Sequence, residues 1–291
     1  MKKPILHNER YSQIKKQHKK KFISNLPNTD KLNESVTNEL GMVEDLSFLT
    51  DNDVLLRFPH LINKPFVRHD VTKRLSVIVP YRDREEHLKI FLKELPSYLE
   101  KQGIDYHITV VEQANNNILF NKGMLFNAGF RETRDFDYFC LHDVDMLPLY
   151  ADYGYDINTP KNIGFFIHPA RYVEKWDYIE LPGYCGGIEI VDRKTYLDVN
   201  GYSISYWGWG LEDDDFNRRC EQNKTTRKIN TEGIYRTLYH AHNYNVHRYI
   251  ENKKVFNSNT PNEKDGLAQT TYKVVSRKKI DNKTTFVSIM F

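Results

Sequence analysis

The pattern of hydrophobic and polar positions changes near residue 70. Residues 1–50 are polar, rich in Lys and Asn, and show no periodicity typical of a core-forming element. A run of short apolar segments separated by polar stretches begins at Leu75. We therefore predict a polar, basic N-terminal arm over residues 1–70 and one folded domain over residues 71–291.

The first apolar segments predict a strand followed by a helix. Leu75–Pro80 is rich in β-branched residues and is typical of a buried strand. Asp83 is the expected N-cap of the helix, with Glu86 three residues on completing a capping box. Pro96 is expected to kink or end this helix. One helical face carries the apolar residues Leu88, Phe91, Leu92, Leu95 and Leu99.

Strand and helix signals then alternate to the C-terminal region. The expected strands are His107–Val111, Tyr138–Leu141, Ile163–Ile167 and Ile188–Val191. The expected helices are Asn121–Thr133, Arg193–Val199 and Asp213–Gln222. This alternation predicts an α/β fold with a single Rossmann-like, mostly parallel central sheet flanked by helices. Ligands of such sheets bind beyond the carboxyl ends of the strands.

Composition narrows the possible partners and the compartment. The 291 residues are 40% hydrophobic, enough for a sizeable core, and the net charge of +3 is too small to indicate nucleic-acid binding. No stretch has the apolar length of a membrane helix, and the N-terminus lacks the apolar core of a signal peptide. Either a leader has been removed or the protein acts in the cytosol, which the initial Met and basic tail favour.

The basic run Lys15–Lys21 has two interpretations. It could make weak peripheral contact with an anionic membrane surface, or it could be a solvated arm, which we favour. A protein that binds polyanions through this arm is a further alternative, although it would leave everything after Leu75 unexplained.

Three cysteines, Cys140, Cys185 and Cys220, are spread along the chain. No pair has the spacing of a zinc site, and an odd number does not suit a disulfide framework. The number and spacing of the cysteines therefore fit a reducing compartment.

Two motifs carry candidate metal ligands. Asp143-Val144-Asp145 follows an apolar strand, and residues two apart on an extended backbone point to the same side, so the carboxylates could hold Mn²⁺ or Mg²⁺. His240 and His242 are also two apart, and with Asp145 they would form a ligand set that suits Mn²⁺. A solvated turn and a pair of surface histidines are the plain alternatives.

The segment Trp207–Asp215 combines aromatic, glycine and acidic residues. Gly208 and Gly210 permit a tightly turned backbone, and the Trp209 ring offers an apolar face on which a sugar could pack. The acidic run opens a helix, whose dipole favours carboxylates there. An ordinary acidic helix start would not explain the two Trp that alternate with Gly.

The segment Pro80–Glu86 lies at a predicted strand end. Arg82 and Arg84 could hold a diphosphate, and Tyr81 could lie against a base. A surface turn of mixed charge is the alternative.

Together these segments resemble glycosyltransferase family 7, the β-1,4-galactosyltransferases. The resemblance runs in family order from Leu75 to the C-terminus, through the segments Val77–Leu88, Phe120–Phe130, Asp143–Pro148, Tyr184–Gly187 and Trp207–Asp215. The branch that this chain resembles within the family is xylosylprotein 4-β-galactosyltransferase, because of Leu211, where most members have a third Gly, and the His240/His242 pair.

The resemblance implies a GT-A catalytic domain over residues 71–291 and an inverting, Mn²⁺-dependent transfer. Asp213 would be the catalytic base, with Glu212 and Asp214 holding donor or acceptor hydroxyls, and Asp145, His240 and His242 would bind the metal. Trp209, Gly210, Leu211 and Asp214 would line the acceptor site. The donor site would comprise Pro80, Tyr81, Arg82, Arg84, Phe120, Asp143, Val144, Tyr184, Gly186, Gly187 and Trp209.

The resemblance also implies the substrates. Tyr at position 184 restricts the family's donor to galactose, so we expect UDP-galactose as donor and a glycan acceptor. Xylose, glucose and N-acetylglucosamine stay open as acceptors, in surface polysaccharide or glycoconjugate synthesis. The alternatives are an N-acetylgalactosaminyltransferase of the same fold and a non-catalytic sugar-binding accessory protein. Trp209 with its glycines, and a polar loop of about residues 241–261, are expected to close over the donor.

Overall fold

The structure is a computed structural model, and the described part of the chain leaves several gaps. It covers residues 58–61, 64, 72–114, 117–156, 164–169, 172–173, 185–229, 233–238, 245–258, 260 and 262–291. The predicted division of the chain at residue 70 stays a prediction, because the residues around that position lie outside these ranges.

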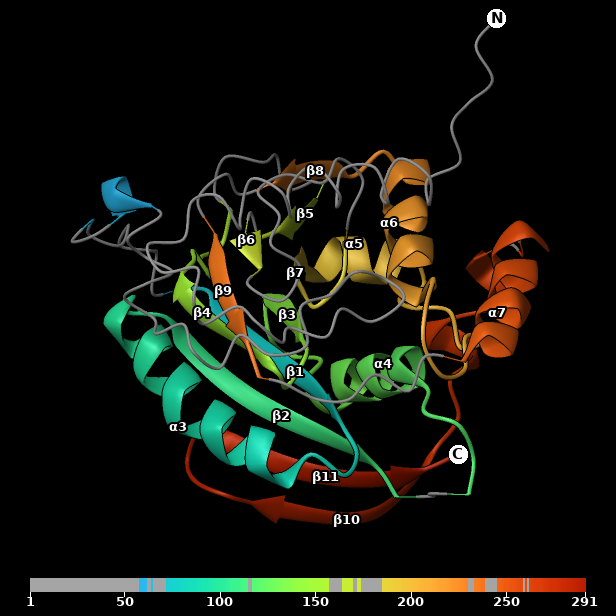
Figure 1. Ribbon diagram of the computed structural model, residues 1–291, viewed down its shortest axis with the longest axis horizontal. Coiled ribbons are helices and arrows are strands. Elements are labelled where there is room, and N and C mark those ends of the chain that lie inside the picture. The colour runs from blue at the N-terminus through green and yellow to red at the C-terminus, as the bar shows by residue number, and fades with distance from the viewer. Residues whose placement is uncertain are drawn as a thin grey trace, which may run out of the picture.

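A large central sheet organises the described residues (Figure 1). Its eight strands lie in the order β10 (Lys273–Lys279), β11 (Thr284–Met290), β2 (Asp105–Gln113), β1 (Arg74–Tyr81), β3 (Tyr138–His142), β7 (Ile188–Asp192), β5 (Phe165–His168) and β8 (Thr226–Ile229). The pairs β11–β2, β2–β1, β1–β3 and β5–β8 are parallel, whereas β7 is antiparallel to both neighbours. The predicted α/β class with a mostly parallel central sheet is confirmed.

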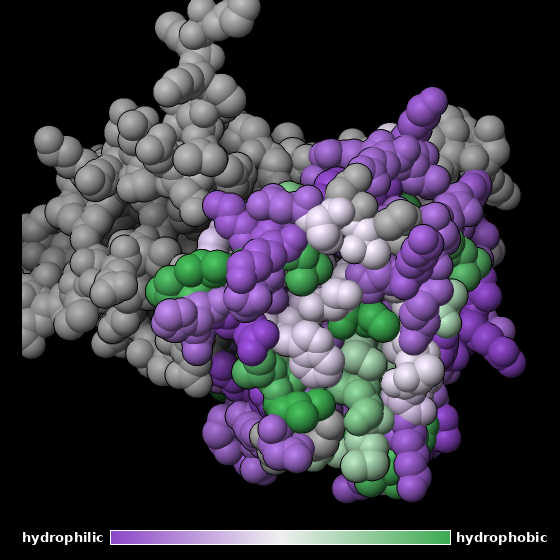
Figure 2. Space-filling model, turned by 90° about the vertical axis from the view of Figure 1, so that its right-hand side faces the viewer, coloured by the Kyte–Doolittle hydropathy of each residue, from purple (hydrophilic) through white to green (hydrophobic). Residues whose placement is uncertain are grey.

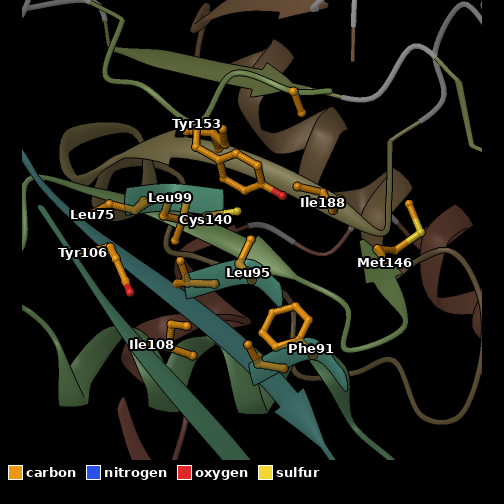
Figure 3. Packing of buried hydrophobic residues seen from close by; sticks show 14 of the residues in the cluster. Leu75, Phe91, Leu95, Leu99, Tyr106, Ile108, Cys140, Met146, Tyr153 and Ile188 are labelled. Carbon is orange, nitrogen blue, oxygen red and sulfur yellow. The ribbon is translucent and has the colours of Figure 1, made fainter. Parts of the chain in front are cut away.

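Helices cover both faces of this sheet. Helix α3 (Glu85–Lys101) covers one face, and α4 (Lys122–Glu132), α5 (Arg193–Asp198) and α6 (Glu212–Gln222) cover the other. The described residues also form α7 (Val246–Ser258) and 3-10 turns at Pro59–Leu61, Asn262–Lys264 and Leu267–Gln269. Alternate residues of β1 point to opposite faces. Leu75 and Val77 share a core with α3 residues such as Phe91, Leu95 and Leu99 (Figure 3), whereas Ile78 packs in a second core with α4.

One detail of α3 corrects a sequence-based prediction, and a second decides between two alternatives that the sequence left open. Asp83 does not cap the helix, because its φ is +53° and Arg84 occupies the N-cap position without a side-chain hydrogen bond. Of the two effects expected of Pro96, a kink or an end of the helix, the end is wrong, because the helix continues to Lys101. Leu95 and Leu99 are fully buried on either side of Pro96. Burial of this face outweighs the one backbone hydrogen bond that a proline inside a helix removes.

A small second sheet lies beside the large one, in the order β4 (Met146–Tyr150), β9 (Ile234–Thr237) and β6 (Tyr172–Val173). The strands β4 and β9 are antiparallel, with Met146 opposite Thr237. The next residue, Leu238, donates its backbone N–H to the carbonyl of Asp145 at 2.8 Å. This pairing brings the chain that leads to position 240 alongside Asp145. None of the described helices is long and apolar enough to cross a membrane.

Candidate active site

The Asp143–Asp145 segment is a turn between β3 and β4. The backbone N–H of Met146 donates to the carbonyl of Asp143 at 3.3 Å, and the N–H of Asp143 donates to the carbonyl of Gly187 at 2.7 Å. The extended backbone predicted here is wrong, because the chain turns at these residues before β4 pairs with β9. Val144 is buried beneath the turn, while the Asp143 side chain stays one-third exposed.

The ammonium group of Lys122 joins this turn to the acidic start of α6. Its Nζ lies 3.1 Å from Asp143 Oδ1, 3.0 Å from Asp213 Oδ2 and 3.9 Å from Glu212 Oε1. Lys122 is the first residue of α4, which Asn121 caps by accepting the Met124 N–H at 2.9 Å. Its side chain is only 11% exposed, so water screens these contacts little. One buried cation therefore holds two acidic segments that are 70 residues apart in the sequence.

The charged groups of this cluster change one another's pKa values. Burial disfavours the charged form of Lys122, but the carboxylates outweigh it, Asp143 first, and raise the pKa of the ammonium well above its usual value. Burial raises the pKa of Asp143 to about 6, and burial together with the charge of Asp213 raises the pKa of Glu212 to about 8. Lys122 limits both increases. The cluster holds more acidic groups than its one cation can neutralise.

Gly186 lets the Asp213 carboxylate approach the backbone. A Cβ at position 186 would lie 2.6 Å from Asp213 Oδ2, and its φ of +132° disfavours residues other than glycine. The Cys185 thiol donates to the Asp213 carbonyl at 3.1 Å, and the Tyr202 hydroxyl lies 3.1 Å from Asp213 Oδ1. Gly187 also has a positive φ, +77°. The predicted Gly186–Gly187 and Asp213 positions therefore meet in one site.

The Trp207–Leu211 segment, here called the Trp segment, is tied down at both ends. Gly208 donates its backbone N–H to the carbonyl of Phe120 at 2.7 Å, and Gly210 donates to Glu212 Oε2 at 3.0 Å. Leu211 has a φ of +75°, in the left-handed region where a side chain costs about 1 kcal/mol. A glycine would fit this backbone without strain, which agrees with the glycine that most of the resembled family has there.

Helix α7 packs directly on the Trp segment. The buried Asn252 donates its amide to the carbonyls of Trp207, Trp209 and Gly210, at 3.2, 3.3 and 3.0 Å. The Trp209 ring, 39% exposed, lies tilted against Tyr249 at 6.1 Å between centroids. The polar loop expected over residues 241–261 is thus wrong for residues 246–258, which form a helix.

Exposed apolar side chains gather on the face that carries α7. Trp209, Val246 and Ile250 are all at least 39% exposed. Figure 2 views this side of the molecule and shows hydrophobic residues among charged ones. Such a mixture suits a sugar, whose C–H faces pack on apolar rings while its hydroxyls need polar partners.

The predicted donor residues at the end of β1 lie beside Phe120. Arg82 donates to the carbonyl of Ile118 at 2.9 Å, and its guanidinium lies 5.2 Å from the centre of the Phe120 ring. Pro80 and Tyr81 are buried, and Arg84 precedes α3. Because the Phe120 carbonyl also accepts from Gly208, this group of residues adjoins the Trp segment.

Three predicted site residues, Tyr184, His240 and His242, lie outside the described residues. Within the part of the chain that is described, no group of three or more His, Cys, Asp and Glu side chains could hold a metal ion. Of the predicted metal ligands, the structure therefore places Asp145 only.

The structure adds four residues that the sequence analysis did not select: Lys122, Glu189, Tyr202 and Asn252. Lys122 lies within the Phe120–Phe130 segment of the resemblance but was given no role, and Glu189 is a charged residue inside a predicted buried strand. Tyr202 and Asn252 carried no local signal, because their partners lie 11 to 45 residues away.

Comparison with known proteins identifies the class and then the family. Structures of the catalytic domain of Drosophila β-1,4-galactosyltransferase 7 align with TM-scores of 0.60, with xylobiose bound, and 0.61, for a mutant with manganese, UDP-Gal and xylobiose. They are 28% and 29% identical to this chain, and each alignment covers 75% of this chain and 94% of theirs. The fold is therefore the GT-A glycosyltransferase fold.

Two family models match consecutive parts of the chain. Residues 67–157 match the N-terminal region of glycosyl transferase group 7, and residues 167–242 match the N-terminal domain of galactosyltransferase. This chain belongs to glycosyltransferase group 7, the family of the β-1,4-galactosyltransferases.

Individual relatives agree with this assignment. The chain is 35% identical to β-1,4-galactosyltransferase 7 of Drosophila melanogaster over 211 residues and 35% identical to β-1,4-galactosyltransferase 3 of Bos taurus over 221 residues. These alignments cover 69% and 72% of this chain but 63% and 54% of the relatives. The chain thus spans less than two thirds of the length of either relative. The predicted resemblance to the family, including its xylosylprotein branch, is confirmed.

The Lys122 cluster yields a stability prediction. Replacing Lys122 by Met should lower the free energy of unfolding by about 3 kcal/mol near pH 9, where Glu212 and Asp143 are both ionised, because it leaves these carboxylates without their cation. The deficit should shrink as the pH falls through the raised pKa values of Glu212, about 8, and Asp143, about 6, because protonated carboxyls no longer repel one another.

Urea unfolding at several pH values would measure this deficit. Lys122→Arg is the matched control, since it keeps the charge and should keep most of the stability. A deficit that is the same at pH 5 and pH 9 would contradict the electrostatic explanation.

Proposed function

We propose that this protein is an inverting β-1,4-galactosyltransferase that moves galactose from UDP-galactose to a sugar hydroxyl. One observation carries the proposal beyond family membership: Asp143 and Asp213 meet at the same lysine, 3.1 and 3.0 Å from its Nζ. The nucleotide-side turn and the acidic helix start therefore share one site. A non-catalytic accessory protein would have no need for this buried cluster of acidic groups.

The proposed base is Asp213. Its carboxylate sits at the start of α6, where the helix dipole favours its ionised form, and it faces the open Gly186 backbone. In an inverting transfer the acceptor hydroxyl attacks the anomeric carbon opposite the departing UDP and loses its proton to a base. Asp213 would take that proton, while Glu212 and Asp214 on the same helix turn would hold substrate hydroxyls.

The proposed donor site lies between β1 and the Asp143 turn. Arg82 and Arg84 would contact the diphosphate, Pro80, Tyr81 and Phe120 the uracil, and Asp143 the ribose. Val144, Tyr184, Gly186, Gly187 and Trp209 would complete this donor site.

The exposed ring of Trp209 adjoins the base through the Trp segment, so this segment would also hold the acceptor. Gly210, Leu211 and Asp214 would complete that subsite.

Mn²⁺ is the proposed cofactor, with Asp145, His240 and His242 as its ligands. The hydrogen bond from Leu238 N–H to the Asp145 carbonyl supports this set. It fixes Leu238 beside Asp145, and the two histidines follow Leu238 by two and four residues in the sequence. One carboxylate and two imidazoles are donors that suit Mn²⁺. A bound metal would supply positive charge to the diphosphate as it leaves.

The proposed donor is inferred from Tyr184, and the proposed acceptor from a similar solved structure. Tyr184 stands at the position that limits the family's donor to galactose. The Drosophila β-1,4-galactosyltransferase 7 structure contains UDP-Gal and xylobiose, so xylosides are the acceptors to test first.

A matrix of donors and acceptors tests the proposal. UDP-galactose should be used faster than UDP-N-acetylgalactosamine or UDP-glucose, with β-xylosides as acceptors, and only in the presence of Mn²⁺. Glucosides and N-acetylglucosaminides are the comparison acceptors. Faster use of UDP-N-acetylgalactosamine would overturn the donor assignment, and no transfer in any combination would overturn the enzymatic function.

Replacing Asp213 by Asn should lower kcat by at least about 100-fold, because the amide cannot accept the acceptor's proton. UDP binding, measured by calorimetry, should change little, since the diphosphate contacts lie elsewhere. Normal transfer by this variant would remove Asp213 from the role of base. Asp198→Asn, on the exposed side of α5, is the matched control and should behave as wild type.

Replacing His240 and His242 together by Ala should raise the Mn²⁺ concentration needed for half-maximal activity by about 10-fold to 100-fold, because two of three ligands are lost. Mn²⁺ titration of activity and of metal binding by calorimetry would measure the shift. His247→Ala, five residues further on, is the control. An unchanged Mn²⁺ requirement in the double variant would place the metal elsewhere.

A further inference from the structure

Glu189 is a buried acid that the proposed chemistry does not use. It lies in β7 between Ile188 and Ile190 and is 1% exposed. Its Oε2 contacts the Tyr202 hydroxyl, and the same hydroxyl lies 3.1 Å from Asp213 Oδ1. Its other oxygen, Oε1, has no hydrogen-bond partner among the described residues. Glu189 is thus one hydroxyl away from the proposed base.

Counting hydrogens shows that this chain of contacts needs one additional proton. The Tyr202 hydroxyl has a single hydrogen but touches two carboxyl groups. If both carboxyls were ionised, one of the two oxygen–oxygen contacts would have no hydrogen and would be repulsive. A proton on either acid removes the conflict.

The surroundings decide which acid holds the proton. Asp213 has Lys122 3.0 Å from its Oδ2, whereas no described residue forms an ion pair with Glu189. Burial, and next the charge of Asp213, raises the pKa of Glu189 well above its usual range. Glu189 is therefore the neutral acid that donates to Tyr202, and Tyr202 in turn donates to Asp213.

Packing leaves the Tyr202 ring little freedom. The ring stacks on Phe216 at 4.3 Å with 12° between the planes, and it lies 5.0 Å from Phe126. Its backbone N–H donates to Asn127 Oδ1 at 3.0 Å. The O–H bond can therefore change its direction only by rotation about the C–O bond. When Glu189 donates to the hydroxyl oxygen, the hydroxyl hydrogen points toward Asp213.

We propose that Glu189 and Tyr202 are positioning residues for Asp213. The neutral Glu189 carboxyl orients the Tyr202 hydroxyl, and this hydroxyl then donates a hydrogen bond to the base. This inference rests on the proposed function, in which Asp213 accepts the proton of the acceptor hydroxyl. The bond from Tyr202 holds the Asp213 carboxylate in one orientation and stabilises its ionised form. The other charged groups that face Asp213 are Lys122 of α4, Glu212 of α6 and Asp143 of the β3–β4 turn.

Four variants test the proposal: Tyr202→Phe, Glu189→Leu, Glu189→Gln and the Tyr202→Phe/Glu189→Leu double variant. Tyr202→Phe should lower kcat about 10-fold to 100-fold, the effect of one hydrogen bond to a charged group, with little change in the KM for UDP-galactose. The acid limb of the kcat/KM profile should move to higher pH, because the ionised base has lost a donor. Glu189→Leu should also lower kcat and move the acid limb to higher pH, but by less than Tyr202→Phe.

The conservative variant separates positioning from simple packing. Glu189→Gln retains an N–H donor of the same length, so it should keep kcat within about threefold of wild type and leave the acid limb in place. The double variant should be no slower than Tyr202→Phe alone, because both residues act through the same hydrogen bond. Unchanged kcat and pH profile in Tyr202→Phe and Glu189→Leu, with only a lower melting temperature, would overturn the proposal.

A second result would overturn the placement of the proton. If Glu189→Gln were as slow as Glu189→Leu, an ionised carboxylate would be needed at position 189. Infrared spectroscopy gives a readout that does not depend on activity. At neutral pH the protonated-carboxyl absorption of the wild-type protein should be larger than that of Glu189→Gln by one carboxyl group, because Glu212 contributes equally to both spectra, and this holds even if no donor is transferred. Equal spectra would contradict a neutral Glu189, whereas an inactive wild type would contradict only the proposed function.

Discussion

The site depends on the attraction between the Lys122 ammonium and the carboxylates around it. Asp143 comes from the β3–β4 turn and Asp213 from the start of α6, and these two segments are far apart in the sequence. Carboxylates at this separation repel one another when buried. The cation at the first position of α4 makes their approach possible, so the capped N-terminus of α4 sets the geometry of the whole site.

Backbone shape is the second constraint on the site. Gly186 provides the space that the Asp213 carboxylate occupies, and the Asp143 N–H is fixed by the Gly187 carbonyl. Asn252 holds the Trp segment through three of its carbonyls. Charged groups, glycines and a buried amide thus restrain one site from different elements, which is the preorganisation that a charge-stabilising site needs.

The proton on Glu189 extends the same electrostatic argument beneath the surface. A site with one cation can hold only a limited number of ionised acids, and Glu189, which forms no ion pair with any described residue, takes up a proton. The excess of acids is then useful rather than destabilising, because a neutral carboxyl can donate a hydrogen bond where a carboxylate cannot.

The sequence by itself determined the central strands and α4, because alternating apolar patterns are local signals. Its short polar motifs also singled out Asp143 and Asp213, which meet at Lys122. It also suggested the family through the order of five motifs. It did not determine the antiparallel direction of β7, the turn at Asp143–Asp145, the helix at 246–258 or the C-terminal strands. Those features depend on partners far along the chain. The roles of Lys122, Glu189, Tyr202 and Asn252 arise only where long-range packing brings charges and hydrogen-bonding groups together, and no local pattern encodes such contacts.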